Sequence, residues 1–216
     1  VPSKPCLLRQ SPLAHQLGDA RGMRGWLCSA QAFVSVMTKC LLSLGSNVGD
    51  RMAHLQAAVQ RLSTPTTTVR SISSVYETEH VGDGATSLPP YLNCVVAVET
   101  TLDPMGLLDH ALRVETMGGR ERPHTHSPRT IDIDLLAYDQ ITLQSARLTL
   151  PHPRLWERAF VLVPLSEIAP CFALPDGRRV ALRASEAEIC AQRIALWPGE
   201  LALPNGSASS AVVTSA

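Results

Sequence analysis

Hydrophobic residues in the middle of the chain recur with two different periods, and these periods predict a mixture of strands and helices. Residues 39–46 and 91–102 are apolar runs bounded by turn residues, and 66–79 alternates between apolar and polar positions, so we expect three strands. Residues 50–62 and 103–117 carry apolar side chains at helical spacing, so we expect two helices there.

A further apolar stretch at 131–139 completes the order β-α-β-β-α-β. This order is typical of an antiparallel sheet with two helices on one face. We therefore predict an α+β fold, a ferredoxin-like two-layer α/β sandwich. Residues 141–151 would continue as a return strand or extended segment, and 152–170 as a loop that leads into an apolar helix. Gly45 is interpreted as a tight exit from the first strand.

The two ends of the chain differ in composition from the middle. Residues 1–36 are irregular and more basic than acidic. They predict an N-terminal extension, either similar to a transit peptide or upstream of a start at Met37, and we favour the second reading. Residues 37–200 would form the folded domain. Residues 201–216, "LALPNGSASSAVVTSA", predict a disordered C-terminal tail.

Charge and cysteine usage limit the classes of function. The chain has 19 basic and 19 acidic residues, so its net charge favours neither nucleic acid nor an acidic membrane. No apolar run reaches the roughly 18 residues that a membrane span needs. The six cysteines are scattered and contain no CxxC pair, which favours free, mostly buried thiols in the reducing cytoplasm. A compact two-layer domain of this size is adequate as a monomer.

The stretch "RTIDIDLLAYD" places two carboxylates inside an apolar strand. Asp132 and Asp134 are two residues apart, so they share one side of the strand, while Ile131, Ile133 and Leu135 face the other side. Neighbouring carboxylates repel, and each raises the pKa of the other. A Mg²⁺ ion held by both, together with phosphate oxygens, removes that penalty. Taken alone, the pair is equally compatible with two solvated acids on an edge strand.

Arginines on both sides of this strand favour the metal–phosphate interpretation. Six of them flank it: Arg120, Arg122, Arg129, Arg147, Arg154 and Arg158. Their planar donor groups fit phosphate oxygens, and no GxxxxGK[ST] loop is present, so the chain is not a P-loop enzyme. A zinc site formed by His124, His126 and His152 is the less favoured alternative, because no Cys or Glu completes a familiar spacing.

Five segments in natural order resemble one enzyme family. They are LLSLGSNVGDR, SSVYET, YLNCVVAVET, GGRER…SPRTIDIDLL and LTLPHPRLWERAFVLVPLSEIAP. Together they resemble the 6-hydroxymethyl-7,8-dihydropterin pyrophosphokinases of folate biosynthesis, over about residues 38–198. The resemblance implies attack of the pterin hydroxymethyl oxygen on the β-phosphorus of ATP, with release of AMP. It also implies two Mg²⁺ ions, with ATP as co-substrate.

The resemblance further implies roles for individual residues. Asp132 and Asp134 would hold Mg²⁺, while Arg120 and Arg129 would clamp the triphosphate and complete the catalytic set. Contacts to ATP would come from Glu115, Arg129, Leu135, Arg147, Thr149, His152 and Arg158. The pterin would lie between the rings of Tyr91 and Phe160, with Asn93 at its edge. The whole set of pterin contacts would be Thr78, Val81, Tyr91, Asn93 and Phe160.

Two other classes of function stay open. Another Mg²⁺-dependent nucleotidyl or phosphoryl enzyme would turn over nucleotide without pterin. A non-catalytic nucleotide- or pterin-binding module would form no product and would still bind after Asp132→Ala and Asp134→Ala. The chain also departs from the family pattern at Glu79–His80 and near His126, which leaves its turnover rate open.

Overall fold

The structure, a computed structural model, describes residues 37–79, 89–119 and 129–204. Its strands are β1 (Thr38–Ser46), β2 (Thr67–Ile72), β3 (Tyr76–Thr78), β4 (Tyr91–Thr100), β5 (Asp132–Tyr138), β6 (Leu143–Gln144), β7 (Thr149–Leu150) and β8 (Ile194–Leu196). Its helices are α1 (Arg51–Leu62), α2 (Pro104–Met117), the 3₁₀ turn η1 (Leu155–Glu157), α3 (Ala159–Ile168), α4 (Val180–Ala184) and α5 (Ala187–Cys190).

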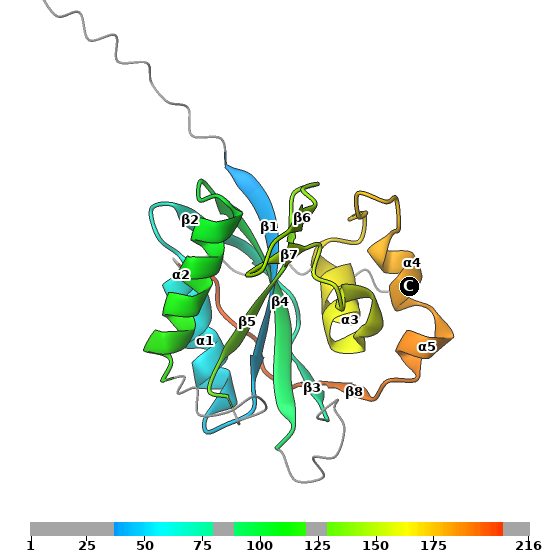
Figure 1. Ribbon diagram of the computed structural model, residues 1–216. Helices are drawn as coiled ribbons and strands as arrows, with labels where there is room; N and C mark the ends of the chain where they lie inside the picture. Colours follow the sequence, from blue (N-terminus) through cyan, green and yellow to red (C-terminus); the bar gives the residue numbers. More distant parts are fainter. Residues whose placement is uncertain (1–36, 80–88, 120–128, 205–216) are drawn as a thin grey trace, which may run out of the picture. The chain divides into compact units, whose positions relative to one another are not determined.

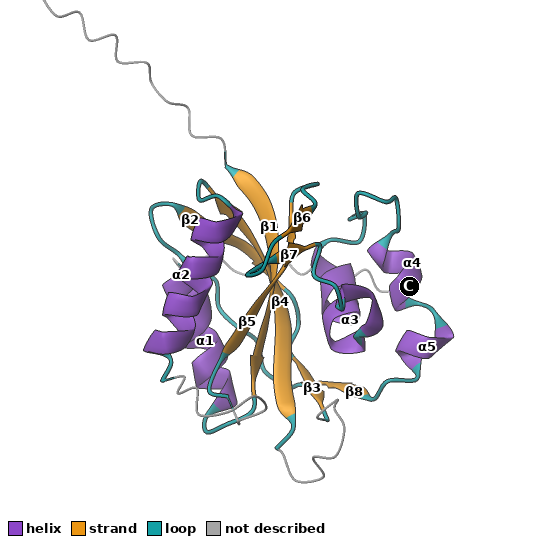
Figure 2. Cartoon of the chain, viewed as in Figure 1, coloured by secondary structure: helices purple, strands orange, loops and turns teal. Residues whose placement is uncertain are grey.

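Six strands form one antiparallel sheet in the order β5-β1-β4-β3-β8, with β2 also paired to β4 (Figure 2). The expected strand at 66–79 is divided into β2 and β3, which pair with successive parts of β4. The expected return segment at 141–151 forms a separate hairpin of β6 and β7. The predicted α+β class and antiparallel sheet are confirmed.

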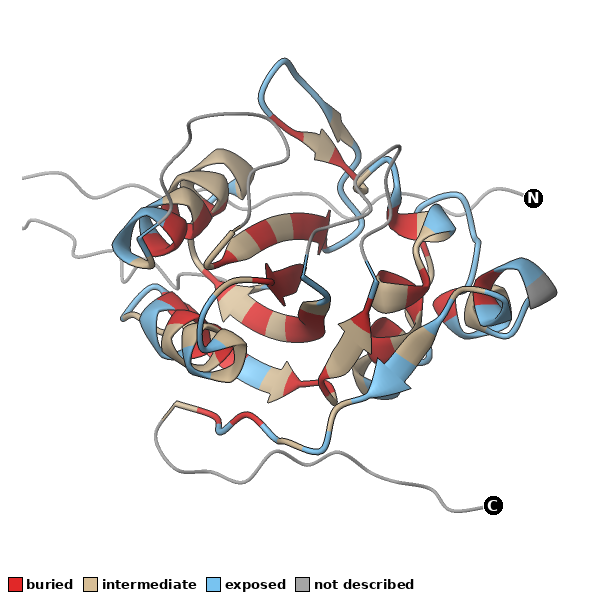
Figure 3. Cartoon of the chain, turned by 90° about the horizontal axis from the view of Figure 1, so that it is seen from below, coloured by how far each residue is buried: buried red, intermediate tan, exposed pale blue. Residues whose placement is uncertain are grey.

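Helices cover both faces of this sheet (Figure 1). Leu42 and Leu44 of β1 pack with α1 and α2 in the larger core cluster. Leu41 and Val95 face the other way and pack with α3. The ferredoxin-like core of a sheet with two helices is thus confirmed, and α3 adds a layer that the sequence pattern did not place. Buried positions lie on the strands and on the helix sides turned toward them (Figure 3).

The helix boundaries follow from capping chemistry. The side chain of Asp50 accepts a hydrogen bond from the N–H of Ala53 at 3.0 Å, and α1 begins at the next residue after Asp50. Asp103 does the same for the N–H of Gly106 at 2.7 Å, with Pro104 in the first turn of α2. Gly118 ends α2, as its Gly-Gly signal predicts.

The ordered core extends beyond the predicted boundary at residue 200. Leu201 and Leu203 are buried in the cluster that contains α1 and α2. The side chain of Gln56 on α1 forms a pair of hydrogen bonds with the backbone of Ala202, at 2.9 and 2.8 Å. The predicted tail therefore starts too early, because alternate leucines in a polar context are enough to pack a short extended segment on the core. Residues 205–216 lie outside the described part.

Two of the four described cysteines are buried and two are exposed. Burial raises the pKa of the Cys40 and Cys94 thiols to about 12, whereas Cys171 and Cys190 are exposed. All four are free thiols, as predicted, but only half of them are buried. Among the described residues, no helix combines the length and the apolar character that crossing a membrane requires.

We predict that Leu201→Ala lowers the free energy of unfolding by about 2–3 kcal/mol, because it leaves a cavity in the main core. Leu201 is 5% exposed, whereas Leu196 is 65% exposed, so Leu196→Ala is the matched control and should change stability by less than about 0.5 kcal/mol. Denaturant unfolding of both variants measures the difference. Equal effects would mean that the segment after β8 does not contribute to the core.

Candidate active site

The face of the sheet toward α3 changes from apolar to polar along its central strands. At one end, Leu41, Val95 and Leu136 pack with α3. Because side chains alternate, the next positions on the same face belong to polar, small or aromatic residues. They are Ser43 and Gly45 of β1, Tyr91 and Asn93 of β4, and Asp132 and Asp134 of β5.

A cavity of about 300 Å³ opens over this polar end. It is lined by Ser43, Gly45, Thr78, Glu79, Tyr91, Asn93, Arg129, Asp132, Asp134, Arg154, Arg158 and Phe160. Eight of the predicted site residues therefore come together here, from β3, β4, β5, the segment before β5 and the start of α3. The size is suited to one small ligand.

The two aspartates face the same side of β5, as the alternation predicts. In the register with β1, Asp134 is opposite Ser43 and Asp132 is opposite Gly45. Burial raises the pKa of Asp134, and the negative charge of Asp132 raises it further, while His152, Arg158 and Arg129 act in the opposite direction. A divalent cation between the carboxylates would relieve this repulsion, so the pair fits Mg²⁺.

Two arginines form ion pairs with the aspartates. Nη1 of Arg129 lies 2.7 Å from Oδ2 of Asp132, and Nη1 of Arg158 lies 3.7 Å from Oδ2 of Asp134. The backbone of Arg129 is itself fixed by Asn47, whose Oδ1 accepts from the Arg129 N–H at 2.7 Å. The Asn47 N–H in turn donates to the Arg129 carbonyl at 3.1 Å. The guanidinium of Arg129 therefore reaches its carboxylate from a backbone that is hydrogen-bonded on both sides.

His152 lies beside the same charges. Burial lowers the pKa of its ring, and Arg158 and Arg154 lower it further, against the raising effect of Asp134. The imidazole is therefore mostly neutral near pH 7. Its Nδ1 accepts a hydrogen bond from the Arg154 N–H at 3.2 Å, which leaves Nε2 as the protonated nitrogen.

The other end of the cavity has aromatic walls and an amide. Tyr91 and Phe160 supply the rings, and the Arg158 guanidinium lies 5.4 Å from the centre of the Phe160 ring. Nδ2 of Asn93 donates to Oγ1 of Thr78 at 2.8 Å. A flat ring with donors and acceptors along its edge suits such a lining.

Gly45 lies within β1 and does not form the exit turn that we predicted. It pairs with Asn93 on one side and with Asp132 on the other. A Cβ at this position would lie 2.9 Å from Oδ1 of Asn93 and 3.8 Å from Cδ1 of Tyr91. Gly45 therefore keeps space open at the floor of the cavity, and this close approach explains the glycine better than turn geometry does.

Five predicted ATP contacts do not line the cavity. One of them, His152, lies close enough to Asp134 and Arg158 to feel their charges. The Leu135 side chain is buried in the core on the opposite face, so any contact with a ligand would involve its backbone. Glu115 on α2 is buried, and its Oε1 accepts from the Ile133 N–H at 2.8 Å, which fastens β5 between the two aspartates. Arg147 pairs with the partly exposed Asp109 at 2.5 Å, and Thr149 belongs to the β6–β7 hairpin.

Two further predicted residues, Val81 and Arg120, lie outside the described residues. The same holds for His124 and His126 of the zinc alternative. Within residues 37–79, 89–119 and 129–204, no group of three or more His, Cys, Asp or Glu residues could hold a metal ion. Two carboxylates alone suit a cation that takes its other ligands from water and phosphate oxygens, which is typical of Mg²⁺.

Sequence reasoning did not include Ser43, Glu79 and Arg154 among the site residues. Ser43 could have been found from β1, where Leu41, Ser43 and Gly45 alternate with Leu42 and Leu44 and so mark a second, less apolar face. Arg154 was recognised as one of the flanking arginines without a role. Nothing in the local sequence distinguishes Glu79 from an exposed loop acid.

The arrangement defines a class of protein. Paired carboxylates with braced arginines suit a metal–phosphate ligand, and the adjacent aromatic walls suit a planar ring, all on one face of a ferredoxin-like sheet. Such a lining suits a phosphoryl-type transferase that brings a nucleotide and a heterocyclic acceptor together.

Comparison with known proteins identifies the family. The model of the family 7,8-dihydro-6-hydroxymethylpterin-pyrophosphokinase (HPPK) matches residues 41–170, and the chain belongs to this family. The 2-amino-4-hydroxy-6-hydroxymethyldihydropteridine pyrophosphokinase of Methylorubrum extorquens is 48% identical over 135 residues, which are 62% of this chain and 84% of that protein. Its counterpart in Bacillus subtilis is 37% identical over 159 residues, 72% of this chain and 88% of that protein.

The fold has relatives among solved structures. Plasmodium falciparum HPPK-DHPS, wild type with SDX-DHP, superposes with a TM-score of 0.55 at 14% identity. The alignment covers 68% of this chain and 44% of that chain, so this protein spans less than half of the Plasmodium chain. At this identity the likeness supports the fold alone.

We predict that Asp134→Asn stabilises the metal-free protein at pH 7, by up to about 1 kcal/mol because the carboxylate is still partly solvated. The folded-state pKa of Asp134 is raised, so the folded state binds this proton more tightly than the unfolded state does. The wild type therefore loses stability as the pH rises through that pKa, and the neutral Asn does not.

Denaturant unfolding in EDTA at several pH values tests this, with the exposed Glu200→Gln as control. The advantage of Asp134→Asn should shrink as the pH falls and Asp134 becomes protonated. A variant that is less stable at pH 7, or an advantage that grows on acidification, would contradict the electrostatic account of the site.

Proposed function

We propose that this protein transfers the pyrophosphoryl group of ATP to the hydroxymethyl oxygen of 6-hydroxymethyl-7,8-dihydropterin and releases AMP, a step of folate biosynthesis. The observation that carries the proposal is the single cavity in which Asp132, Asp134 and the arginines meet Tyr91, Asn93 and Phe160. Membership of the pyrophosphokinase family supports it.

At the phosphate end, Asp132 and Asp134 would hold two Mg²⁺ ions. When bound, these ions would neutralise phosphate charge and thereby lower the barrier to transfer. Arg129 and Arg158 already lie against the two carboxylates, so their remaining N–H groups are available to oxygens of the triphosphate. Neutral His152 can donate from Nε2 to another oxygen. Arg120, which precedes β5 in the sequence, would complete the set.

At the pterin end, Tyr91 and Phe160 would stack on the two faces of the ring. Asn93 uses Nδ2 for Thr78, so Oδ1 is left to accept an N–H from the ring edge. Gly45 supports this role because no side chain covers Oδ1 from the floor of the cavity. The whole set of proposed pterin contacts is Thr78, Val81, Tyr91, Asn93 and Phe160.

The reaction needs positioning and charge stabilisation, and no covalent enzyme intermediate. The bond from the pterin oxygen to the β-phosphorus forms, the bond from that phosphorus to the α,β-bridging oxygen breaks, and AMP leaves with the electron pair. The hydroxyl proton passes to solvent. The braced guanidinium of Arg129, together with Arg120, would stabilise the negative charge that develops on the transferred group and on AMP.

The remaining parts of the proposal concern nucleotide contacts and cellular context. Glu115, Leu135, Arg147 and Thr149 stay proposed ATP contacts, with Leu135 acting through its backbone. We also propose a monomer that works in the cytoplasm, which is supported by the free thiols among the described cysteines.

We predict pterin-dependent formation of AMP from ATP and Mg²⁺. Asp132→Asn and Asp134→Asn should each lower kcat by about 100- to 1,000-fold, because each removes charge stabilisation in the transition state. Asp139→Asn is the matched control: it lies just after β5 and is exposed, so its rate should stay within about twofold of the wild type. Coupled release of AMP is the measurement.

Other outcomes separate the alternatives. AMP or ADP formed equally without pterin would favour another nucleotide enzyme. Folded wild-type protein that binds ATP and pterin but forms no product would favour a binding module. Full activity in both aspartate variants would contradict the role of the carboxylate pair.

A further inference from the structure

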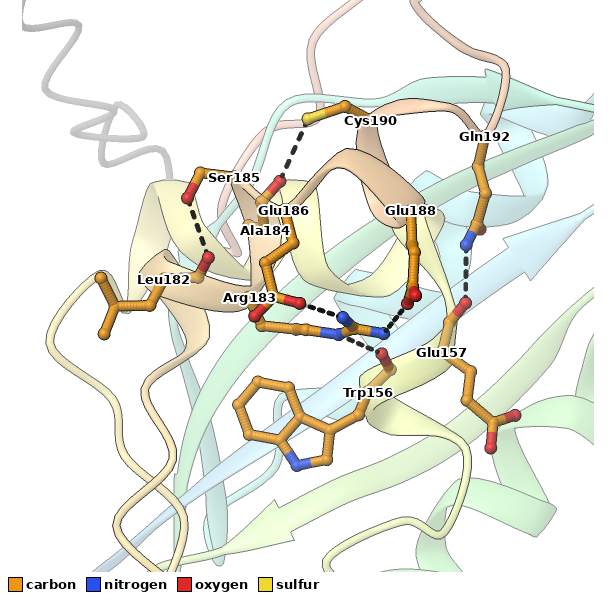
Figure 4. A network of polar contacts seen from close by, with 10 residues as sticks. All are labelled: Trp156, Glu157, Leu182, Arg183, Ala184, Ser185, Glu186, Glu188, Cys190 and Gln192. Carbon is orange, nitrogen blue, oxygen red and sulfur yellow. Dashed lines mark hydrogen bonds and ion pairs between the residues drawn. The ribbon is translucent and has the colours of Figure 1, made fainter.

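The segment after α3 forms hydrogen bonds to the turn that carries two of the arginines lining the cavity. The turn η1 lies between Arg154 and Arg158, and both of these line the cavity. Residues 171–193, which include α4 and α5, come after the part of the chain that the family model matches, 41–170. Side chains of this segment hold the backbone of the turn (Figure 4).

Gln192 makes the two central contacts. Its Nε2 donates to the carbonyl oxygen of Glu157 at 2.7 Å, and its Oε1 accepts from the N–H of Ala159 at 2.8 Å. These two backbone groups lie on either side of Arg158. One amide side chain therefore forms a hydrogen bond on each side of Arg158, as the backbone of a paired β-strand would.

The contact with Ala159 also caps α3. The first N–H groups of a helix have no partner within the helix and need one from elsewhere. Arg158 occupies the N-cap position of α3, but its side chain makes no capping hydrogen bond. Gln192 supplies the missing acceptor from 33 residues further along the chain.

Arg183 holds the preceding peptide of the same turn. Its Nε donates to the carbonyl oxygen of Trp156 at 3.0 Å. Its two terminal nitrogens pair with Glu186 and Glu188, which orient the guanidinium toward the turn (Figure 4). The carbonyls of Trp156 and Glu157 and the N–H of Ala159 are thus all held by residues 183–192.

Bracing the backbone at Arg158 matters because of what its side chain contacts. The guanidinium lies 3.7 Å from Asp134 and 5.4 Å from the Phe160 ring centre, so it sits where the phosphate and pterin ends of the cavity meet. A small rotation of the backbone is amplified at the tip of a long side chain. Displacement of the guanidinium would therefore weaken its charge-assisted hydrogen bonds to a bound phosphate.

We propose that Gln192 is a positioning residue for Arg158. It acts through the backbone on both sides of Arg158, with Arg183 in support, and it keeps the guanidinium on the phosphate-binding side of the cavity. This inference rests on the proposed function, because it gives Arg158 the task of binding ATP.

The test replaces Gln192 with Met, which keeps most of the length and removes both hydrogen bonds. The KM for ATP should rise about tenfold, while kcat and the KM for pterin stay within about twofold. Arg193→Met is the matched control, since Arg193 is the exposed neighbour of Gln192. It should leave all three constants unchanged. If Gln192→Met does not fold, Gln192→Glu, which loses the donor to Glu157, is measured in the same way.

The same substitution in an Arg158→Ala background separates positioning from general structure. If Gln192 acts through Arg158, Gln192→Met should add less than about twofold to the effect of Arg158→Ala. Equal losses in both backgrounds, or a fall in kcat at unchanged KM for ATP, would mean that Gln192 only maintains the fold, and would overturn the proposal.

Measurements that do not require turnover test the positioning role independently of the proposed reaction. Amide exchange at Ala159 should be faster in Gln192→Met than in Arg193→Met, and calorimetry should show weaker binding of a non-hydrolysable ATP analogue with Mg²⁺. Both effects in a protein that forms no pterin-dependent AMP would sustain the positioning role and refute the proposed reaction. Unchanged exchange and unchanged binding would overturn the positioning role, whatever the activity.

Discussion

The whole site depends on the alternation of side chains across β1, β4 and β5. One face of these strands is mostly apolar and packs against α1 and α2. The other face is apolar only where α3 covers it and becomes polar beyond. A slip of one residue in the register of β5 would turn Asp132 and Asp134 into the main core and bring Ile133 to the cavity. The buried face therefore fixes the direction in which the carboxylates point.

Charged residues of the cavity are held by polar side chains that bind the backbone next to them. Asn47 brackets Arg129, Glu115 binds the N–H between the two aspartates, and Gln192 brackets Arg158. A long charged side chain does not keep one conformation by itself, because ordering it costs conformational entropy. Fixing the peptide from which it projects reduces that cost before a ligand arrives, which is the preorganisation that charge-stabilising catalysis requires.

The elements with strong hydrophobic patterns could be predicted from the sequence: α1 and α2 each bury one regular face, and β1, β4 and β5 are largely apolar runs. The division between β2 and β3 could not, because it depends on how both segments share β4. Within the site, the aspartates and aromatic residues were predicted, but the prediction that Gly45 forms a turn after the first strand was wrong. Its constraint comes from Asn93 on a neighbouring strand and not from its own backbone. Gln192 has no local signal either, since its contacts lie 33 and 35 residues away.

The most direct test of the account is a crystal structure with Mn²⁺ in place of Mg²⁺, a non-hydrolysable ATP analogue and 6-hydroxymethyl-7,8-dihydropterin. The account predicts anomalous peaks within about 2.5 Å of carboxylate oxygens of both Asp132 and Asp134. It also predicts the pterin between Tyr91 and Phe160, with its hydroxymethyl group toward the metal. Metal bound away from these aspartates, or pterin outside the two rings, would contradict the assignment of this sheet face as the active site.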